Sequence, residues 1–247
     1  MQRLAIIADI HGNLPALEAV LADIKASGVA SIVNLGDCVS GPLWPAETMH
    51  LLEREALATV RGNHDRWLGE MSRERMGPSD AFAFDRLTAT QIESLRALPP
   101  RLHLGDDIVA VHGTPHSDVE YLIEDVVAGR LAPAAPAQLR QRLDGLDRAV
   151  ILCGHSHRAS VVRTPENVLI INPGSVGCPG YLDPTPPAHV SEAGSPHARY
   201  GLLNATASGW RVELLAIAYD WAAAARRAAE YGREDWARAL ATGFVVG

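Results

Sequence analysis

The sequence predicts an α/β fold in which two packed mixed β-sheets are flanked by helices. Two observations favour this class. In the first half of the chain, short apolar strands alternate with segments whose apolar residues recur at helical spacing, as in βαβ units. In the second half, strand-like segments follow one another with little helix between them. The 247 residues, 47% of them hydrophobic, suit one large domain or two small ones, and we interpret residues 1–247 as a single domain.

The first half is predicted to contain three strands and three helices. Asn13 is suited to cap the first helix, and Pro15 lies in its first turn. Pro99 and Pro100 end the third helix, because proline cannot continue a helix. The predicted strands are residues 2–8, 31–35 and 58–60, and the predicted helices are residues 14–26, 46–55 and 79–98.

The second half is predicted to be mainly β. Residues 118–143 are an exception, predicted as one or two helices interrupted at 133–136. Residues 178–197 are rich in proline, glycine and serine and are predicted to form a loop, and residues 221–242 a terminal helix. The predicted strands are residues 101–104, 108–111, 149–152, 159–163 and 168–171, followed by a hairpin of residues 198–204 and 210–215.

The bulk composition excludes several classes of function. A formal net charge of -7 without a run of Lys or Arg argues against binding to duplex nucleic acid. The chain contains no apolar run of the roughly 18 to 20 residues that cross a bilayer, so we expect a protein without a signal peptide or membrane span. Three cysteines without a CxxC pair indicate neither a disulfide framework nor a thiolate zinc site, and a reducing cytoplasm fits best.

Five short segments concentrate potential metal ligands, and each follows a predicted strand. Because the carboxyl ends of strands in an α/β sheet face one crevice, loops that are distant in sequence can converge there. Carboxylate, imidazole and amide ligands without thiolate favour Mn(II), Fe(II), Zn(II), Ni(II) or Co(II). The segments are Asp9-Ile10-His11, Gly36-Asp37, Gly62-Asn63-His64-Asp65, His112-Gly113 and Gly154-His155-Ser156-His157.

Taken singly, most of these segments also have a purely structural interpretation. Residues 9–11 could form an Asx turn that caps the following helix, and Asp37 and His112, each beside a glycine, could belong to ordinary turns. Residues 62–65 are more specific, because a plain turn needs no run of three polar side chains. The alternating histidines of residues 155–157 share one face of an extended segment, which favours a ligand role.

Other histidines and cysteines fall outside the five segments or beside their ligands. Cys38 and Cys153 adjoin candidate ligands and are interpreted as small buried residues. His116, four residues after His112, is a weaker candidate for lining the pocket. Four more histidines are interpreted as surface or loop residues: His50, His103, His189 and His197.

In this order, DIHGN, GD, GNHD, HG and GHSH resemble the signature of the calcineurin-like metallophosphoesterase superfamily. The resemblance covers residues 9 to about 177. HGNLPALEAVL at residues 11–21 and NPGSVG at residues 172–177 are similar to the smaller branch of bacterial and archaeal phosphodiesterases. The resemblance implies a four-layer αββα sandwich of two mixed β-sheets flanked by helices.

The resemblance also implies a role for each candidate residue. Two divalent metal ions would be bridged by Asp37. His64 would donate a proton, and Asp65 would orient its imidazole. The ligands of one ion would be Asp9, His11 and His157, and those of the other would be Asn63, His112 and His155.

Phosphoester hydrolysis follows from such a site by a known chemistry. Two cations about 3.5 to 4 Å apart neutralise the phosphoryl oxygens and lower the pKa of water toward about 7, so that metal-bound hydroxide attacks in line. A protonated His64 would donate to the leaving oxygen. The sequence leaves open the alternative that His64 only binds phosphate.

The sequence departs from the smaller branch after NPGSVG, where that branch commonly continues with Gln-Pro-Arg. Here residues 178–181 read Cys-Pro-Gly-Tyr, so the expected arginine is missing. Arg199 or Arg158 could compensate, and residues 178–197 could shape the substrate pocket.

We therefore expect a phosphoesterase that hydrolyses small phosphodiesters, with no membrane or duplex nucleic acid as partner. The resemblance favours diesters, and the chain lacks the anion cradle of a P-loop. The alternatives are a phosphomonoesterase or nucleotide phosphatase of the same fold, a two-metal hydrolase of another bond such as an amide, and a silent metal-binding scaffold. The sequence leaves the oligomeric state open.

Overall fold

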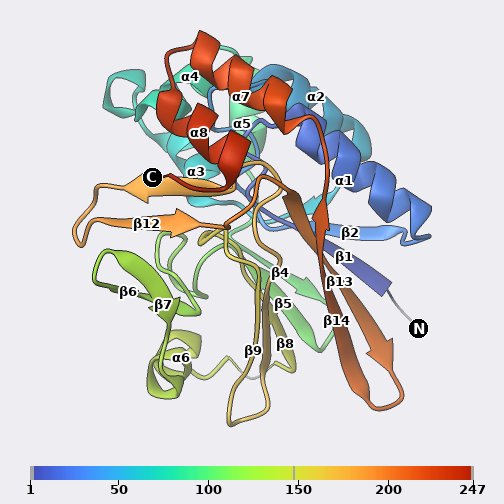
Figure 1. Ribbon diagram of the computed structural model, residues 1–247. Helices are drawn as coiled ribbons and strands as arrows, with labels where there is room; N and C mark the ends of the chain where they lie inside the picture. The colour runs from blue at the N-terminus through green and yellow to red at the C-terminus, as the bar shows by residue number, and fades with distance from the viewer. Residues whose placement is uncertain (1–2, 147, 246–247) are drawn as a thin grey trace.

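Three β-sheets with flanking helices make up the computed structural model, which describes residues 3–146 and 148–245 (Figure 1). Mixed sheets flanked by helices were predicted, and this class is confirmed. The third sheet was not predicted. Gln2, the first residue of the predicted N-terminal strand, lies outside the described residues.

The first sheet joins both ends of the chain. Its order is β14-β13-β1-β2-β3, with β1, β2 and β3 parallel and β13 antiparallel to both β1 and β14. The first half of the chain thus supplies the parallel part, and the predicted C-terminal hairpin extends it. The strands are β1 (Arg3–Ile7), β2 (Ser31–Asn34), β3 (Ala58–Thr59), β13 (Ala198–Thr206) and β14 (Gly209–Ile217).

The second sheet is formed by the middle of the chain. Its order is β4-β5-β8-β10-β9, with β5, β8 and β10 parallel and the two edge strands antiparallel. All five strands were predicted within one residue of their observed ends. They are β4 (Arg101–Leu104), β5 (Ile108–Val111), β8 (Val150–Leu152), β9 (Ser160–Arg163) and β10 (Leu169–Asn172).

These two sheets pack against each other through one hydrophobic cluster. Ile6 and Val33 of the first sheet contribute to it together with Leu152 of the second. Because side chains alternate along a strand, Ile7 belongs to a second cluster, in which Leu17 of α1 covers the outer face of the first sheet. The two faces of β1 are therefore both buried. The stricter order of four layers stays a prediction.

The helices largely follow the predicted ranges, but two of the predicted helices are each split in two. Residues 79–98 are interrupted before Thr88, which caps a new helix. Residues 221–242 are interrupted at Gly232, whose φ of 71° suits the left-handed region that glycine adopts. The helices are α1 (Leu14–Ala26), α2 (Pro45–Glu55), α3 (Asn63–Glu70), a 3-10 helix (Arg73–Arg75), α4 (Pro78–Phe84), α5 (Ala89–Arg96), α6 (Pro136–Leu143), α7 (Trp221–Glu230) and α8 (Glu234–Thr242).

The third sheet corrects two predictions. Residues 118–143 were predicted as one or two helices interrupted at 133–136, and α6 confirms the second of these. The residues before α6 instead form a hairpin, in which Ala128 and Gly129 adopt positive φ angles that suit a tight turn. Residues 178–197 were predicted to be a loop, but they form two paired strands. The sheet has the order β11-β12-β7-β6, with β6 (Glu124–Val127), β7 (Arg130–Pro133), β11 (Gly180–Asp183) and β12 (His189–Glu192).

Among the helices of residues 3–146 and 148–245, none is both long enough and apolar enough to span a bilayer.

Candidate active site

All seven predicted metal ligands lie at one end of the two large sheets. Parallel strands end at the same edge of a sheet, so the turns that follow β1, β2 and β3 lie beside those that follow β5 and β8. Direct contacts join the two sets: the backbone N–H of His155 donates to Asp9 Oδ1 at 3.3 Å, and His112 Nε2 lies 3.0 Å from Asn63 Oδ1. The predicted convergence of distant loops is therefore observed.

Within this edge the carboxylate and imidazole ligand atoms form two groups. The first cluster comprises Asp9, His11 and His157, and the second cluster comprises Asp37, His112 and His155. In each cluster the ligand atoms lie within 4.8 Å of one another. Either cluster could hold a metal ion.

The backbone at these ligands is strained. Nine non-glycine residues of the described chain have positive φ, and five of the nine are candidate ligands. Non-glycine side chains seldom adopt this region, and such strain persists only where the surrounding structure enforces it. The five are Asp9 (φ 54°), His11 (50°), Asp37 (56°), His155 (67°) and His157 (59°).

Backbone carbonyls fix three of the imidazoles. The Nδ1 atom of His11 lies 2.7 Å from the Ser40 carbonyl, that of His157 lies 2.7 Å from the Cys178 carbonyl, and that of His112 lies 2.8 Å from the carbonyl of Leu35, directly after β2. A carbonyl only accepts, so each Nδ1 carries the proton. In the neutral imidazole each Nε2 then presents a lone pair to the cluster, the orientation that second-shell partners impose on metal-binding histidines.

The lone pairs face other acceptors. His11 Nε2 and His157 Nε2 are 3.1 Å apart, and His112 Nε2 lies 3.0 Å from Asn63 Oδ1. Asp9 Oδ2 is buried and has no hydrogen-bond partner within residues 3–146 and 148–245. Acceptors repel one another at such distances unless a proton or a cation lies between them. The residues present therefore fit a pair of cations, with the amide oxygen of Asn63 as a further ligand beside the second cluster.

The pKa values show what this burial does to the charges. Burial raises the pKa of Asp9 to about 8 and lowers that of His11 to about 4 and that of His155 to about 3. Burial alone would also lower the pKa of His112, but the carboxylate of Asp37 outweighs it and raises the pKa to about 10. A metal ion requires neutral imidazoles and ionised carboxylates, so a cation would take the place of these protons.

Asp37 lies between the two clusters. Its Oδ2 atom is 3.3 Å from His112 Nε2 and 3.8 Å from His11 Nε2, while its Oδ1 accepts from the backbone N–H of His64 at 3.0 Å. Gly62 makes this approach possible, because a Cβ atom there would stand 2.1 Å from Asp37 Oδ1. The position of Asp37 suits a ligand shared by two ions.

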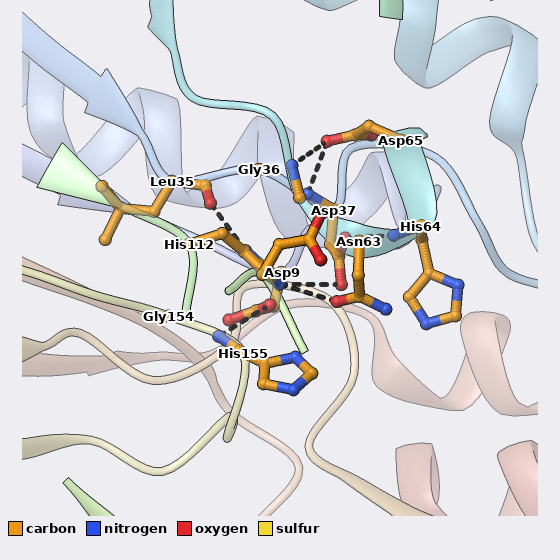
Figure 2. A network of polar contacts seen from close by, with 12 residues as sticks. Asp9, Leu35, Gly36, Asp37, Asn63, His64, Asp65, His112, Gly154 and His155 are labelled. Carbon is orange, nitrogen blue, oxygen red and sulfur yellow. Dashed lines mark hydrogen bonds and ion pairs between the residues drawn. The ribbon is translucent and has the colours of Figure 1, made fainter. Parts of the chain in front are cut away.

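The predicted role of Asp65 is wrong. Its carboxylate accepts from the backbone N–H groups of Asp37, Cys38 and Gly62 at 2.9 to 3.0 Å, so it fixes two ligand loops instead of the His64 ring (Figure 2). The bond from the Gly62 backbone N–H to Asp65 is one half of a capping box at the start of α3, since Gly62 has no side chain to supply the other half.

Asp80 of α4 takes the role that was predicted for Asp65. Its Oδ1 lies 2.7 Å from His64 Nδ1 and also accepts from the Ser40 hydroxyl at 2.7 Å. Burial alone would lower the pKa of His64, but Asp80 and then Asp37 raise it to about 9. The imidazole is therefore a cation at neutral pH, and its Nε2–H is the group left for a substrate. Asp80 lies 16 residues after His64, and no local pattern marks it.

The third sheet and the loop before it add a second set of residues that sequence reasoning missed. The Tyr121 ring stacks on the His155 ring at 4.8 Å, and the Tyr181 ring contacts that of His157 at 4.7 Å. The Tyr121 hydroxyl lies 2.7 Å from the Tyr181 hydroxyl and 2.8 Å from His189 Nε2. His189 was interpreted as a surface or loop residue, but it lies buried in β12, so that interpretation is wrong.

Ser156, between His155 and His157, anchors this turn through its hydroxyl. The Ser156 hydroxyl donates to Glu124 Oε1 at 2.8 Å and accepts from Asn172 Nδ2 at 3.0 Å. Burial raises the pKa of Glu124 to about 7. The third sheet thus supports the strained GHSH segment through Glu124.

The remaining sequence predictions have different outcomes. Cys38 and Cys153 are buried, as expected. His116 has a side chain 56% exposed and pairs with Asp144, so it faces solvent. The two arginines proposed to replace the missing one are engaged elsewhere: Arg158 donates to the Leu131 carbonyl, and Arg199 donates to the Ala193 carbonyl and the Ser195 hydroxyl.

Comparison with known protein families shows which family contains this site. Residues 2–190 match the calcineurin-like phosphoesterase superfamily domain, which is more than half of the chain. The chain belongs to the calcineurin-like phosphoesterase superfamily. The resemblance expected from DIHGN, GNHD and GHSH is thereby confirmed, and the two ligand clusters are the candidate metal centre of a metal-dependent phosphoesterase.

Several individual proteins are similar to this member of the superfamily. A metallophosphoesterase from Sphaerobacter thermophilus is 28% identical, with a TM-score of 0.74, over 98% of this chain and 99% of that one. A hypothetical protein from Pyrococcus horikoshii shares the fold over the full length of both chains, with a TM-score of 0.77 at 19% identity. An uncharacterized protein of Methanocaldococcus jannaschii is 29% identical over 202 residues, 71% of this chain and 76% of the relative.

Proposed function

We propose that the protein is a dinuclear-metal phosphodiesterase. The observation that carries the proposal is the meeting of acceptor atoms from five loops around two centres, with His11 Nε2 and His157 Nε2 only 3.1 Å apart. A buried group of lone pairs is costly without cations to bind it. Family membership supports phosphoester hydrolysis as the reaction.

The ligand residues would act as two sets with one shared member. We assign one divalent ion to Asp9, His11 and His157, the other to Asn63, His112 and His155, and the bridging position to Asp37. Mixed oxygen and imidazole ligands suit Mn(II), Fe(II), Zn(II), Ni(II) or Co(II). When bound, the two ions supply a water activated for attack and neutralise the phosphoryl oxygens.

His64 would serve the leaving group. Asp80 holds Nδ1 and raises the pKa of the imidazole, so that Nε2–H keeps its proton at neutral pH. That proton can pass to the leaving oxygen as the ester bond breaks, which removes the charge that would build up there. If His64 only bound phosphate, its loss would weaken substrate binding and leave the dependence on the leaving group unchanged.

The preference for diesters rests on charge. A diester carries one negative charge and a monoester about two at neutral pH. Two arginines near the site are held by carboxylates: Arg66 by Asp118 at 2.6 and 2.8 Å, and Arg233 by Asp235 at 3.0 and 2.8 Å. Besides the protonated His64, the site thus relies on its metal ions for positive charge, which suits a monoanion.

The test is a comparison of two substrates. Protein loaded in turn with Mn(II), Ni(II), Zn(II) or Co(II) is incubated with bis-p-nitrophenyl phosphate and with p-nitrophenyl phosphate. We expect turnover of the diester to exceed that of the monoester. Faster turnover of the monoester would assign a phosphomonoesterase, and metal binding without turnover of either would assign a silent scaffold.

A matched pair of variants ties the activity to this site. His112→Ala removes a ligand of the second cluster, whereas His103→Ala removes an exposed imidazole of β4. We expect the first to abolish turnover and the second to leave it unchanged. Equal activities would place the reaction elsewhere.

A further inference from the structure

Besides the partly exposed His155, the site opens toward solvent at His64. The His64 side chain is 25% exposed, whereas that of His11 is 4% exposed and that of His112 is 1% exposed. In the proposed function His64 donates a proton to the leaving oxygen. The leaving group of the substrate must therefore lie at this opening, where it can extend away from the buried ions.

Two tryptophans border the opening. Trp67 lies three residues after His64 on α3, so one helical turn brings its ring to 4.8 Å from the His64 ring. The rings of His64 and His11 are 5.4 Å apart, and the ring of Trp236 lies 5.9 Å from that of His11. Both tryptophans are partly exposed. The leaving-group side of the site thus has an aromatic ring at each end of the His64–His11 pair.

Trp236 comes from a part of the chain beyond the match to the family, which ends at residue 190. Figure 1 shows α7 and α8, coloured red, at the same end of the molecule as α3 and α4. Leu240 and Ala224 dock these helices on Leu43, in the loop that follows the bridging Asp37. A Cβ atom at Gly41 of that loop would lie 3.0 Å from the tip of Trp236. The position of this ring is therefore well defined by packing.

Arg233 ties the same helix to the proton donor. One of its guanidinium nitrogens donates to the Ser79 hydroxyl at 2.9 Å, and Ser79 precedes Asp80, the partner of His64. The rest of its guanidinium is bound by Asp235, as Arg66 is bound by Asp118. Both arginines are thus paired with carboxylates, although the Arg233 guanidinium carbon lies 5.8 Å from the centre of the Trp236 ring. The border of the opening therefore offers aromatic rings and little positive charge beyond that of His64, which is itself paired with Asp80. It suits an uncharged planar group better than a chain of further phosphates.

We propose that Trp67 and Trp236 are specificity-determining residues that contact a planar aromatic ring on the leaving group of a phosphodiester. The inference rests on the proposed function, because it takes the leaving group to lie at His64. An aryl alcohol and a nucleoside both carry such a ring. Contact with one tryptophan contributes roughly 10-fold to the affinity for the substrate.

The test uses three diesters that differ in the leaving group. Methyl p-nitrophenyl phosphate has an aryl leaving group, a dinucleoside monophosphate has a nucleoside, and glycerophosphoglycerol has an alkyl alcohol, with turnover followed by phosphorus NMR. Trp236→Leu and Trp67→Leu are compared with Trp221→Leu, a matched change on α7 whose ring contacts His197 and Tyr219.

We expect each of the first two changes to raise KM roughly 10-fold for a ring-bearing leaving group while leaving kcat and the alkyl diester unaffected. The Trp221 variant should match the wild type with all three. A rise confined to the aryl or to the nucleoside diester identifies which source of the ring the site accepts. A KM that is unchanged, or raised equally for the alkyl diester, would overturn the inference.

A binding measurement separates this inference from the proposed function. Metal-loaded protein is titrated with phenyl phosphate and with methyl phosphate while tryptophan fluorescence is recorded. We expect quenching by phenyl phosphate alone, and weaker quenching in the Trp236 variant, which keeps only Trp67 at the opening. Wild-type protein that turns over none of the diesters would refute the proposed function, whereas equal quenching in the wild type and the Trp236 variant would overturn the role of the ring.

Discussion

The two ligand clusters are built differently, although Asp37 of the second cluster also faces His11 of the first at 3.8 Å. In the first cluster both imidazoles are buried and bonded through Nδ1 to backbone carbonyls, and Asp9 adds a fully buried carboxylate. The second cluster is completed by the neutral amide of Asn63, and its His155 is partly exposed and stacked on Tyr121.

The difference shows how one centre can hold one metal ion tightly while the other ion exchanges its ligands for substrate oxygens. Apart from Asp37, the first set has a carboxylate and two rigid imidazoles, whereas the second has an amide, the rigid His112 ring and the partly exposed His155 ring. The first set should hold a divalent ion more strongly, because charge and rigidity both favour binding. We therefore expect the first cluster to bind its ion more tightly and the second, which adjoins His64, to accept substrate oxygens.

Loss of the shared ligand should have the largest effect. Asp37→Asn removes the negative charge between His112 and His11, so both ions should bind weakly and turnover should fall by on the order of 10³-fold. The metal content after gel filtration and the rate with bis-p-nitrophenyl phosphate measure this. Asp106→Asn in the exposed turn after β4 is the control. Two tightly bound ions in the Asp37 variant would show that the clusters are independent.

Removal of one imidazole from each cluster should distinguish the two ions. His157→Ala should eliminate the tight step of a Mn(II) titration, whereas His155→Ala should eliminate the weak step and leave the tight one. Both variants should lose turnover by at least about 100-fold, because each leaves one ion. Isothermal titration calorimetry resolves the steps. The reverse pattern would mean that the partly exposed cluster is the stronger.

The pH dependence of kcat can distinguish the proposed role of His64 as proton donor from the roles of the two clusters. His64 has a pKa raised to about 9, so its proton is present below that pH and lost above it. Asp80→Asn removes the largest influence that raises this pKa, so the alkaline fall in kcat should move to lower pH by about one unit. Metal content should stay unchanged.

Asp85→Asn, an exposed carboxylate paired with Arg73 just after α4, provides the control for this pH profile. If the Asp80 variant kept the wild-type profile, the role assigned to His64 as a proton donor would be wrong. A loss of metal in that variant would mean that Asp80 acts on the ligands instead.

The smallest effect on metal binding is expected for Tyr121, whose ring packs on His155 of the second cluster. Tyr121→Leu removes the ring that stacks on His155, so the weaker ion should bind roughly 10-fold less tightly while the first ion is unaffected. Tyr121→Phe keeps the ring and loses the hydroxyl that contacts His189, so its effect should be smaller. Co(II) absorption spectra report each site. Equal weakening of both ions would point to a general loss of structure.

The candidate metal ligands were predictable because they follow strands that end at one edge of each sheet. Asp9, Asp37 and His112 lie beside apolar runs, and their spacing is visible in the sequence. Asp80 was not predictable, since only the folded position of α4 brings it to His64, 16 residues away in the chain.

The third sheet escaped prediction for a different reason. Its hairpin turns at Ala128-Gly129, where an alanine adopts a positive φ that propensity disfavours. The sequence does not mark that turn, and residues 118–143 were therefore predicted to be helical. The tyrosines that support His155 and His157 were missed together with the sheet, because Tyr181 belongs to β11 and pairs with Tyr121 in the loop before β6.

Anomalous diffraction from crystals soaked in Mn(II) tests the central claim most directly. The account predicts two peaks about 3.5 to 4 Å apart, one among Asp9, His11 and His157 and one among Asn63, His112 and His155, with Asp37 touching both. A single peak at this edge of the sheets, or peaks only at other side chains, would contradict it.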